Sequence, residues 1–387
     1  MIRFAAPEVS AADEAAVLRA LRSGWLSTGD ECSQLEDELA AFCGAGHAVA
    51  LSSCTAALDI ATASLRLRPG ARVGVPTWTF AATAQPAAQL GAVPVLLDVD
   101  PTTLNVDPVS LEEALPDLDA VVVVHFGGVP VDRRVLDACA AAGVPVIEDA
   151  AHALGAHDHR GAIAGRSTVG ACFSFYATKN LTSAEGGALV TDDVRLAAYA
   201  RAQRSHGMTD DAWRRYDPNG PDRYDIVELG RKANLPDVLA ALARSQLARF
   251  DEIQSTRRGL AERYRASLAT VDGVDIVPDH PHPGSADHLM VITLPDDVRR
   301  DVVVASMRAA GVITHVHFTP LHRYTWFATH AAIGPSGVKA AERLADRVLS
   351  LPLHTQLRPT DVDRVVATLA VAIDAARATS SRPHATG

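Results

Sequence analysis

The stretch AVVVVHFGGVPVDRRVLDACAAAGVPVIEDA, residues 120–150, holds two short apolar runs with a helix-like segment between them. The runs at 120–126 and 144–150 are rich in β-branched residues and do not alternate with polar ones, which is typical of strands buried on both faces of a sheet. Residues 132–142 between them are rich in alanine. A strand, a helix and a second strand in this order predict two parallel strands joined by a crossover helix.

The same alternation extends outward from this stretch. We predict further strands at 71–76, 92–100, 169–176 and 186–191, and helices at 55–67, 79–90 and 108–115. The last two strand runs follow each other without a clear helix, so their order and direction in the sheet stay open. The pattern predicts the α/β class, with a mostly parallel sheet covered by helices on both faces.

The C-terminal third has a different organisation. A long helix is predicted from Pro236, followed by a strand at 288–295, a helix and strand within 301–318, and a closing helix at 361–378. A chain of 387 residues is too long for one simple core. We therefore predict two domains, a large one at 1–250 and a smaller C-terminal α/β domain at 251–387.

Composition excludes several classes of function. The formal net charge is −10 and no basic run interleaved with aromatics occurs, which argues against binding to nucleic acid. No apolar run approaches the roughly 20 residues that span a membrane, and the N-terminus lacks an apolar signal core. The five cysteines form no C-x-x-C pair, which favours reduced thiols and a cytoplasmic location.

Four stretches with polar or aromatic residues fall at predicted strand ends, where open α/β sheets bind ligands. They are SSCTAAL (52–58), PTWTF (76–80), IEDAAHA (147–153) and SFYATKN (174–180). The first opens a helix with small polar residues, so it is either an anion site or an ordinary helix cap. In the third, Glu148 and Asp149 point to opposite faces if they lie on a strand, and a structural ion pair is the alternative to a functional carboxylate.

Lys179 follows a run of apolar and aromatic residues and precedes a cluster of small ones. A lysine amine in a confined site can form a Schiff base with a carbonyl compound. Pyridoxal phosphate needs such a lysine, an acidic partner for its ring nitrogen, an anion site for its phosphate and a flat apolar face. Lys179, Asp149, the turn at 53–55 with Ser174, and an aromatic residue at 78–80 supply these four parts.

Longer stretches in the same order resemble one family over nearly the whole chain. They are VPTWTFAATAQPAAQLGAVPVLLDVDPTTLNVDP, VVHFGGVPVD, IEDAAHALGA, FSFYATKNLTSAEGGALVT, RSHGM, LGRKANLPDVLAALARSQL, GVITHVHFTPLH and LSLPLH. The chain resembles the DegT-type nucleotide-sugar aminotransferases, pyridoxal-phosphate enzymes of the aspartate aminotransferase fold (fold type I). The resemblance implies a large domain with a mostly parallel seven-stranded sheet flanked by helices, and a smaller C-terminal α/β domain.

The resemblance also assigns roles to residues of the coenzyme site. It implies that Lys179 forms the Schiff base and moves protons, and that Asp149 keeps the ring nitrogen protonated. Phe80 takes the position of the ring-stacking aromatic, with Trp78 as its neighbour. His152 stands where the family usually has glutamine, and is expected to reach the phenolic oxygen of the coenzyme.

Other matching positions imply contacts with the phosphate, the partner subunit and the substrate. Cys54, Thr55 and Ser174 match the phosphate-binding positions. In most members a dimer partner adds an asparagine to the phosphate, and in the segment GRKAN either Lys232 or Asn234 takes that part. A homodimer with shared sites is therefore expected. The expected substrate-side residues are His317, His322, Tyr176 and Glu185, although a packing role for the histidines stays open.

The resemblance implies an aminotransferase with pyridoxal 5'-phosphate as coenzyme and pyridoxamine 5'-phosphate as its intermediate form. L-glutamate or L-glutamine is the expected donor and a nucleotide-linked keto-deoxy sugar the expected acceptor. The lysine in GRKAN favours amination at C4 of a dTDP- or UDP-linked 4-keto-6-deoxyhexose. A C3 keto-sugar or ketocyclitol aminotransferase and a pyridoxal-phosphate-binding regulator without turnover stay open. A nucleotide-binding oxidoreductase is disfavoured because G-x-G-x-x-G is missing after the first strand.

Histidine pairs raise the question of a metal site. HDH (157–159), HPH (280–282) and HVH (315–317) have the spacing of two-histidine sites. A converging third ligand is not evident in the sequence, so we predict no metal.

Overall fold

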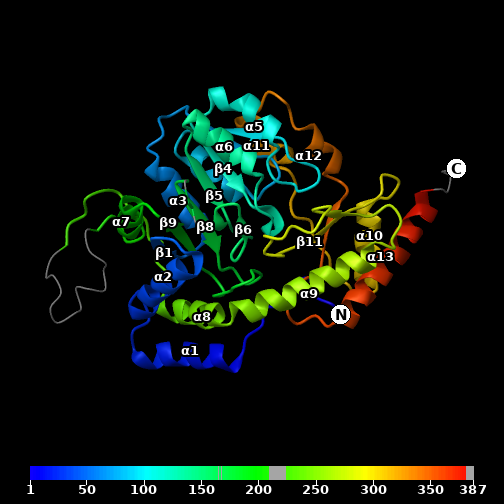
Figure 1. The fold of residues 1–387 in the computed structure, drawn as a ribbon, viewed down its shortest axis with the longest axis horizontal. Coiled ribbons are helices and arrows are strands. Elements are labelled where there is room, and N and C mark those ends of the chain that lie inside the picture. Colours follow the sequence, from blue (N-terminus) through cyan, green and yellow to red (C-terminus); the bar gives the residue numbers. More distant parts are fainter. Residues whose placement is uncertain (164, 167, 209–223, 381–387) are drawn as a thin grey trace.

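The structure of the chain is a computed structural model that describes residues 1–163, 165–166, 168–208 and 224–380. In this part of the chain a large sheet has the strand order β1-β9-β8-β5-β4-β2-β3-β12, and a small one the order β10-β11-β13. Figure 1 shows the chain with β1, β9, β8, β5 and β4 of the large sheet labelled. A short hairpin, β6 (His157–Asp158) and β7 (Gly161–Ala162), stands apart from both.

The large sheet is mostly parallel, as predicted. Among its described strands only β9 is antiparallel to its neighbours, and it follows β8 without a crossover helix. Seven strands come from the first 191 residues, and the two-residue β12 adds an eighth at the edge beside β3. The sequence pattern missed β1. The strands are β1 (His47–Leu51), β2 (Arg72–Pro76), β3 (Val93–Leu97), β4 (Ala120–Val124), β5 (Val146–Asp149), β8 (Gly170–Ser174), β9 (Gly187–Thr191) and β12 (Ala332–Ile333).

Helices cover both faces of this sheet because alternate strand residues point to opposite sides. In β4, Val122 packs in the core under α3, α4 and α7, whereas Val121 and Val123 pack under α5 and α6. Helices α2 and α8 cover the strands at the β1 end on the second face. The helices are α1 (Ala11–Ser23), α2 (Asp30–Cys43), α3 (Cys54–Ser64), α4 (Gln85–Gln89), α5 (Pro108–Ala114), α6 (Arg133–Ala142), α7 (Val194–Gln203) and α8 (Asp237–Ala248).

The C-terminal unit packs three helices on the small antiparallel sheet. Its strands are β10 (Asp275–Val277), β11 (Met290–Thr293) and β13 (Val348–Leu351), and the three helices are α9 (Phe250–Leu268), α10 (Arg300–Ala309) and α13 (Pro359–Ser380). The same part of the chain holds two short helices, α11 (Thr325–His330), whose Phe327 packs in the core of the large sheet, and α12 (Lys339–Leu344). The core of this unit lies between the sheet and α9, α10 and α13. The strand predicted near 312–318 is wrong, since Val312 and His315 make only isolated bridges, to Ile2 and Ser350.

The long helix predicted from Pro236 is broken at Arg249 into α8 and α9, which together run from the large unit to the small one (Figure 1). Arg249 leaves helical geometry, with φ −117°, and its guanidinium donates to a carboxylate oxygen of Asp13 at 3.1 Å and to the carbonyl of Glu8 at 3.0 Å. Contacts with the first helix thus accompany the break.

The predicted domain boundary near residue 250 falls at this break, and two segments cross it. Ile2 packs in the core of the C-terminal unit, and β12 joins the large sheet. The division at residue 250 stays a prediction. In the described part of the chain, no helix is long and apolar enough to cross a membrane. The five cysteines are free and buried.

Candidate active site

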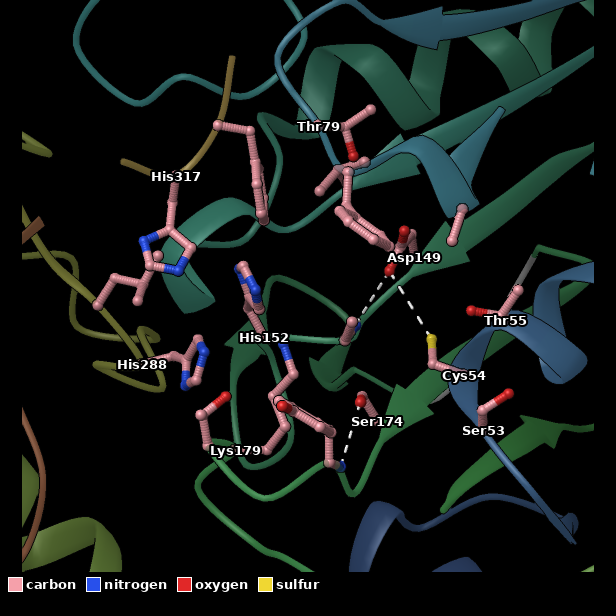
Figure 2. A pocket seen from close by; sticks show the side chains of 18 of the residues that line it. Ser53, Cys54, Thr55, Thr79, Asp149, His152, Ser174, Lys179, His288 and His317 are labelled. Carbon is pink, nitrogen blue, oxygen red and sulfur yellow. Dashed lines mark hydrogen bonds between the residues drawn. The ribbon is translucent and has the colours of Figure 1, made fainter. Parts of the chain in front are cut away.

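A cavity of about 380 Å³ opens at the carboxyl ends of the parallel strands, between the large unit and the C-terminal unit (Figure 2). Pockets of a few hundred cubic ångströms are typical of small-molecule and cofactor sites. Ten of the predicted site residues line it: Cys54, Thr55, Phe80, Asp149, His152, Ser174, Tyr176, Lys179, Glu185 and His317. The predicted convergence of four distant stretches at one sheet edge is therefore found.

The N-terminus of α3 forms one wall of the cavity. Ser53 caps the helix by accepting a hydrogen bond from the amide of Ala56 at 3.1 Å. A Cβ atom at Gly187 on β9 would lie 2.4 Å from the amide nitrogen of Cys54, so only glycine lets this helix end approach the sheet so closely. Free amide groups and the helix dipole make this end suited to an anion such as a phosphate, beside the hydroxyls of Thr55 and Ser174.

Asp149 ends β5 and turns its carboxylate into the cavity, where it is 6% exposed. The hydroxyl of Thr83 donates to one oxygen at 2.7 Å, and the amide of Ala151 to the other at 3.2 Å. Thr83 is itself 2.6 Å from the hydroxyl of Thr79. Burial raises the pKa of Asp149, while the hydrogen bonds from Thr83 and Ala151 oppose that rise. A cationic partner in the cavity would favour the carboxylate form.

Glu148 points to the opposite side of β5, as strand alternation predicts. It lies fully buried, 3.0 Å from Nε2 of His125, and accepts hydrogen bonds from Arg160 and from Thr168, the latter at 2.7 Å. Burial alone would raise the pKa of Glu148. The hydrogen bonds from His125 and Thr168 and the charges of His125 and Arg160 outweigh this effect and lower the pKa. Glu148 is thus the structural ion pair, and Asp149 faces the cavity.

Lys179 lies on the loop after β8, and its amide donates to the carbonyl of Tyr176 at 2.9 Å. The side chain reaches into the cavity (Figure 2). No described residue makes a hydrogen bond with its amine. Burial lowers the pKa of Lys179 to about 8, against the opposite effect of Asp149. Near neutral pH the amine is therefore much closer to its nucleophilic, neutral form than an ordinary lysine.

Three histidines form the wall on the side of the C-terminal unit (Figure 2). They are His152 after β5, His288 before β11 and His317 after α10. The ring of His152 is 4.4 Å from that of His288, and Nδ1 of His317 is 3.1 Å from the hydroxyl of Ser350. Burial and the charge of Lys179 lower the pKa of all three, in the case of His317 to about 3. The wall is therefore polar and uncharged.

Aromatic side chains of the PTWTF stretch take different places. Phe80 lines the cavity and is 61% exposed. Trp78 is fully buried, and its Nε1 donates to the carbonyl of His317 at 3.0 Å. The position of Phe80 is compatible with the stacking role, which stays a prediction.

Three predicted site residues lie outside this cavity. Nδ1 of His322 is 2.8 Å from the hydroxyl of Thr77, and its Nε2 is 2.7 Å from Glu342, so His322 belongs to a hydrogen-bonded cluster beside the cavity. The amine of Lys232 donates to the side-chain carbonyl of Asn234. The amide of Asn234 in turn donates to the hydroxyl of Thr28 at 2.7 Å. Lys232 and Asn234 thus lie together and do not line the cavity of their own chain.

Sequence reasoning missed several residues of the site. Thr83 and Thr79 support Asp149, and His288 lies in the histidine wall; Phe4, Thr178 and Phe318 also line the cavity. Thr83 lies just after the PTWTF stretch, and His288 begins the segment 288–295, for which the pattern predicts only a strand. Nothing local marks either residue, because both act through contacts with residues far away in the chain.

Among the described residues, no group of three or more histidine, cysteine, aspartate or glutamate side chains is arranged to hold a metal ion.

A buried carboxylate and a buried amine with a lowered pKa, beside a helix N-terminus in an α/β fold, define the class of pyridoxal-phosphate enzymes. The chain belongs to the DegT/DnrJ/EryC1/StrS aminotransferase family, which matches residues 7–370.

Three relatives illustrate the similarity. The chain is 39% identical over 356 residues to the spore coat polysaccharide biosynthesis protein SpsC of Bacillus subtilis (strain 168), covering 90% of this chain and 91% of SpsC. The PMP form of the putative sugar aminotransferase Spr1654 from Streptococcus pneumoniae is 26% identical, with a TM-score of 0.88 over 97% of this chain and 100% of that one. DesI in the presence of its TDP-sugar product is 31% identical, with a TM-score of 0.85 over 98% and 95% of the chains.

The chain is accordingly a sugar aminotransferase that depends on pyridoxal phosphate. The residues present fit this coenzyme by the chemistry of their groups: Lys179 offers an amine, Asp149 a carboxylate, and the α3 terminus amide and hydroxyl groups for a phosphate.

Proposed function

We propose that the protein transfers an amino group from L-glutamate or L-glutamine to a nucleotide-linked keto-deoxy sugar, at C4 of a dTDP- or UDP-linked 4-keto-6-deoxyhexose. The observation that carries this proposal is the meeting of Lys179 and Asp149 in one cavity with the N-terminus of α3. The similarity to DesI, whose structure was solved in the presence of its TDP-sugar product, supports a nucleotide-linked substrate. Lys232 in the segment GRKAN, through the family resemblance, favours amination at C4 of the sugar.

The proposed roles follow from the groups that each residue presents. When bound, the coenzyme supplies an electron sink that allows an amino group to move between carbon atoms. Lys179 binds the coenzyme and moves a proton at its Nζ. Asp149, held by Thr83 and Ala151, stabilises a positive charge on the ring nitrogen.

Other residues of the cavity bind and orient. The hydroxyls of Thr55 and Ser174, with Cys54 at the α3 terminus, bind the phosphate. Phe80 would cover one face of the ring, and His152, whose Nδ1 accepts from the amide of Gly127, would offer the N–H of Nε2 to the coenzyme.

We assign the sugar side of the cavity to Tyr176, Glu185 and His317, which line it. His322 is not included, because both of its ring nitrogens already have partners in Thr77 and Glu342. Tyr176 is exposed enough to contact a ligand that extends out of the cavity. A neutral His317 suits hydrogen bonds with sugar hydroxyls.

We further propose that the enzyme is a homodimer in which Lys232 or Asn234 reaches the phosphate site of the partner subunit. The two side chains lie together away from the cavity of their own chain. A cation or an amide from outside would complement the phosphate dianion, since charged hydrogen bonds typically contribute roughly 1.5–3 kcal/mol.

The test is a panel of substrates. The protein is loaded with pyridoxamine phosphate and offered nucleotide-linked 4-keto sugars, 3-keto sugars and a ketocyclitol, with coenzyme absorbance followed over time. Rapid conversion by a dTDP- or UDP-linked 4-keto-6-deoxyhexose supports the proposal, and preference for a 3-keto sugar or a cyclitol overturns the C4 assignment. Conversion by none, with bound coenzyme, favours a regulator without turnover. Lys179→Ala is the control: with L-glutamate or L-glutamine added to regenerate the pyridoxamine form, it should lack the multiple turnover of the wild type.

A further inference from the structure

The N-terminal strap, residues 2–8, runs beside the cavity from the C-terminal unit to the large unit. At its start the amide of Ile2 donates to the carbonyl of Gly311 at 2.7 Å. At its end the carbonyl of Glu8 accepts from the side-chain amide of Gln246 on α8 at 3.0 Å. Because both ends of the strap are held by hydrogen bonds, the residues between them have a defined place.

Phe4 lies within this strap and lines the cavity. Its ring is stacked on that of His317, with centroids 5.2 Å apart and 28° between the planes. It also makes an edge contact with the ring of His315, with centroids 4.8 Å apart and 63° between the planes. Both geometries are typical of favourable aromatic pairs. The two histidines of the HVH stretch are therefore partners of one phenyl ring.

His317 is also held by two residues of the fold. Its Nδ1 is 3.1 Å from the hydroxyl of Ser350 on β13, and its carbonyl accepts from Nε1 of Trp78 at 3.0 Å. Within the described part of the chain, Nε2 of His317 has no hydrogen-bond partner. Since His317 lines the cavity (Figure 2), this nitrogen is available to a bound ligand.

The contacts of Phe4 lie on the sugar side of the cavity. In the described part of the chain, its ring contacts are with His315 and His317, and neither is assigned to the coenzyme. Phe4 is thus well placed to affect the sugar through His317 without holding the coenzyme.

We propose that Phe4 is a positioning residue for His317: its ring fixes the plane of the imidazole, so that Nε2 is held ready for the sugar that receives the amino group. A side chain that is already ordered loses less freedom when a ligand binds, which strengthens binding. The inference rests on the proposed role of His317 on the sugar side and does not depend on which sugar is the substrate.

The first test observes the ring contact itself, in the coenzyme-loaded protein without substrate. Protons over the face of a phenyl ring resonate upfield, and ¹³C-labelled histidine gives access to the ring protons of His317, assigned by their loss in His317→Gln. Phe4→Leu should move these signals. Phe4→Tyr keeps the aromatic ring and should leave them close to their wild-type positions. Signals that are unchanged in Phe4→Leu, or that move equally in Phe4→Tyr, would overturn the inference.

The second test is a double-mutant cycle on the sugar half-reaction, followed by absorbance after loading with pyridoxamine phosphate. Phe4→Leu should lower the second-order rate constant for the sugar by about two- to tenfold, mainly by weakening sugar binding, and Phe4→Tyr should lower it less. If Phe4 acts through His317, then Phe4→Leu causes little further loss in a protein that already carries His317→Ala. Additive losses would contradict the positioning role.

Phe42 provides the matched control. Its ring pairs with that of Phe250 with centroids also 5.2 Å apart, and it does not line the cavity. Phe42→Leu should lower the stability of the protein and leave both the His317 signals and the sugar half-reaction unchanged. A loss of the sugar half-reaction equal to that in Phe4→Leu would mean a general loss of packing, and would overturn the inference.

The outcomes separate this inference from the proposed function. If the wild type converts no sugar, the proposed function fails, and the His317 signals still decide whether Phe4 fixes the ring. If His317→Ala converts the sugar like the wild type, His317 has no part in sugar binding. The inference then fails while the aminotransferase activity stands.

Discussion

Lys179 is a residue whose pKa is strongly lowered by the site. Its pKa falls from 10.5 to about 8, mainly because of burial. A lysine with a lowered folded-state pKa destabilises the folded protein at low pH, where both states are protonated. Between about pH 8 and 10.5 only the unfolded state keeps the proton, so this penalty disappears as pH rises.

Replacement of the lysine should therefore stabilise the coenzyme-free protein. At pH 7 we expect Lys179→Met to raise the free energy of unfolding by on the order of 3 kcal/mol. The gain should shrink between pH 8 and 10.5. Urea unfolding of both proteins at pH 7, 8, 9 and 10 measures it, and a gain that is absent at pH 7 or that grows with pH would contradict the lowered pKa.

Thr83 is the second residue whose effect can be isolated. Its hydroxyl donates to Asp149 at 2.7 Å inside the protein. Removing that donor raises the pKa of the carboxyl further and leaves an oxygen without a partner. We expect Thr83→Val to weaken binding of pyridoxal phosphate by roughly tenfold or more, since a hydrogen bond to a charged group contributes roughly 1.5–3 kcal/mol.

Thr83→Ser is the matched control, because it keeps the hydroxyl and loses only a methyl group. Titration of each coenzyme-free protein with pyridoxal phosphate, followed by absorbance, gives the dissociation constants. If the Thr83→Val and Thr83→Ser proteins bind pyridoxal phosphate equally well, the hydroxyl of Thr83 has no part in holding Asp149.

At the scale of elements, the approach of α3 to β9 depends on one glycine. A Cβ at Gly187 would lie 2.4 Å from both the amide nitrogen of Cys54 and the carbonyl carbon of Ser53. Backbone atoms cannot move aside easily, so Gly187→Ala must shift the N-terminus of α3. We expect a loss of stability of about 1–3 kcal/mol and weaker binding of inorganic phosphate and coenzyme.

Gly259 provides the comparison for this substitution. It lies on the exposed side of α9, where an added Cβ would meet nothing within 4 Å. Gly259→Ala should stabilise the protein by roughly 0.5–1 kcal/mol, through helix propensity alone. Thermal unfolding and phosphate binding of the two variants separate the effects, and a Gly187→Ala protein as stable as wild type would refute close packing at this helix end.

The elements also show what the sequence can predict. Parallel strands bring their carboxyl ends to one edge, so the meeting of 76–80, 147–153 and 174–180 followed from the order of strands and helices. The place of 52–58 did not follow from that order, because β1 before it was missed. The break at Arg249 did not follow, because the apolar pattern continues through it and the partners Asp13 and Glu8 lie more than 230 residues away. His288 was missed for the same reason, since its role arises from contacts with residues 152 and 180.

At the scale of the whole molecule, the proposed homodimer places parts of each active site on two chains. Lys232 and Asn234 lie together outside the cavity that holds Lys179. If they complete the partner's site, then Lys179→Ala and the double variant Lys232→Ala/Asn234→Ala damage opposite halves of a site. In a mixed dimer one site carries both defects and the other carries neither.

Mixing the two inactive variants should therefore restore activity. With random exchange of subunits in equal amounts, half of the dimers are mixed and each has one intact site of two, so about a quarter of the wild-type activity is expected. Subunit exchange is verified with two affinity tags, and each variant incubated alone is the control. A monomer at working concentration, or no recovery after proven exchange, would exclude the shared site. Separate single variants, Lys232→Ala and Asn234→Ala, then identify the residue that crosses, because only its loss should weaken retention of the coenzyme.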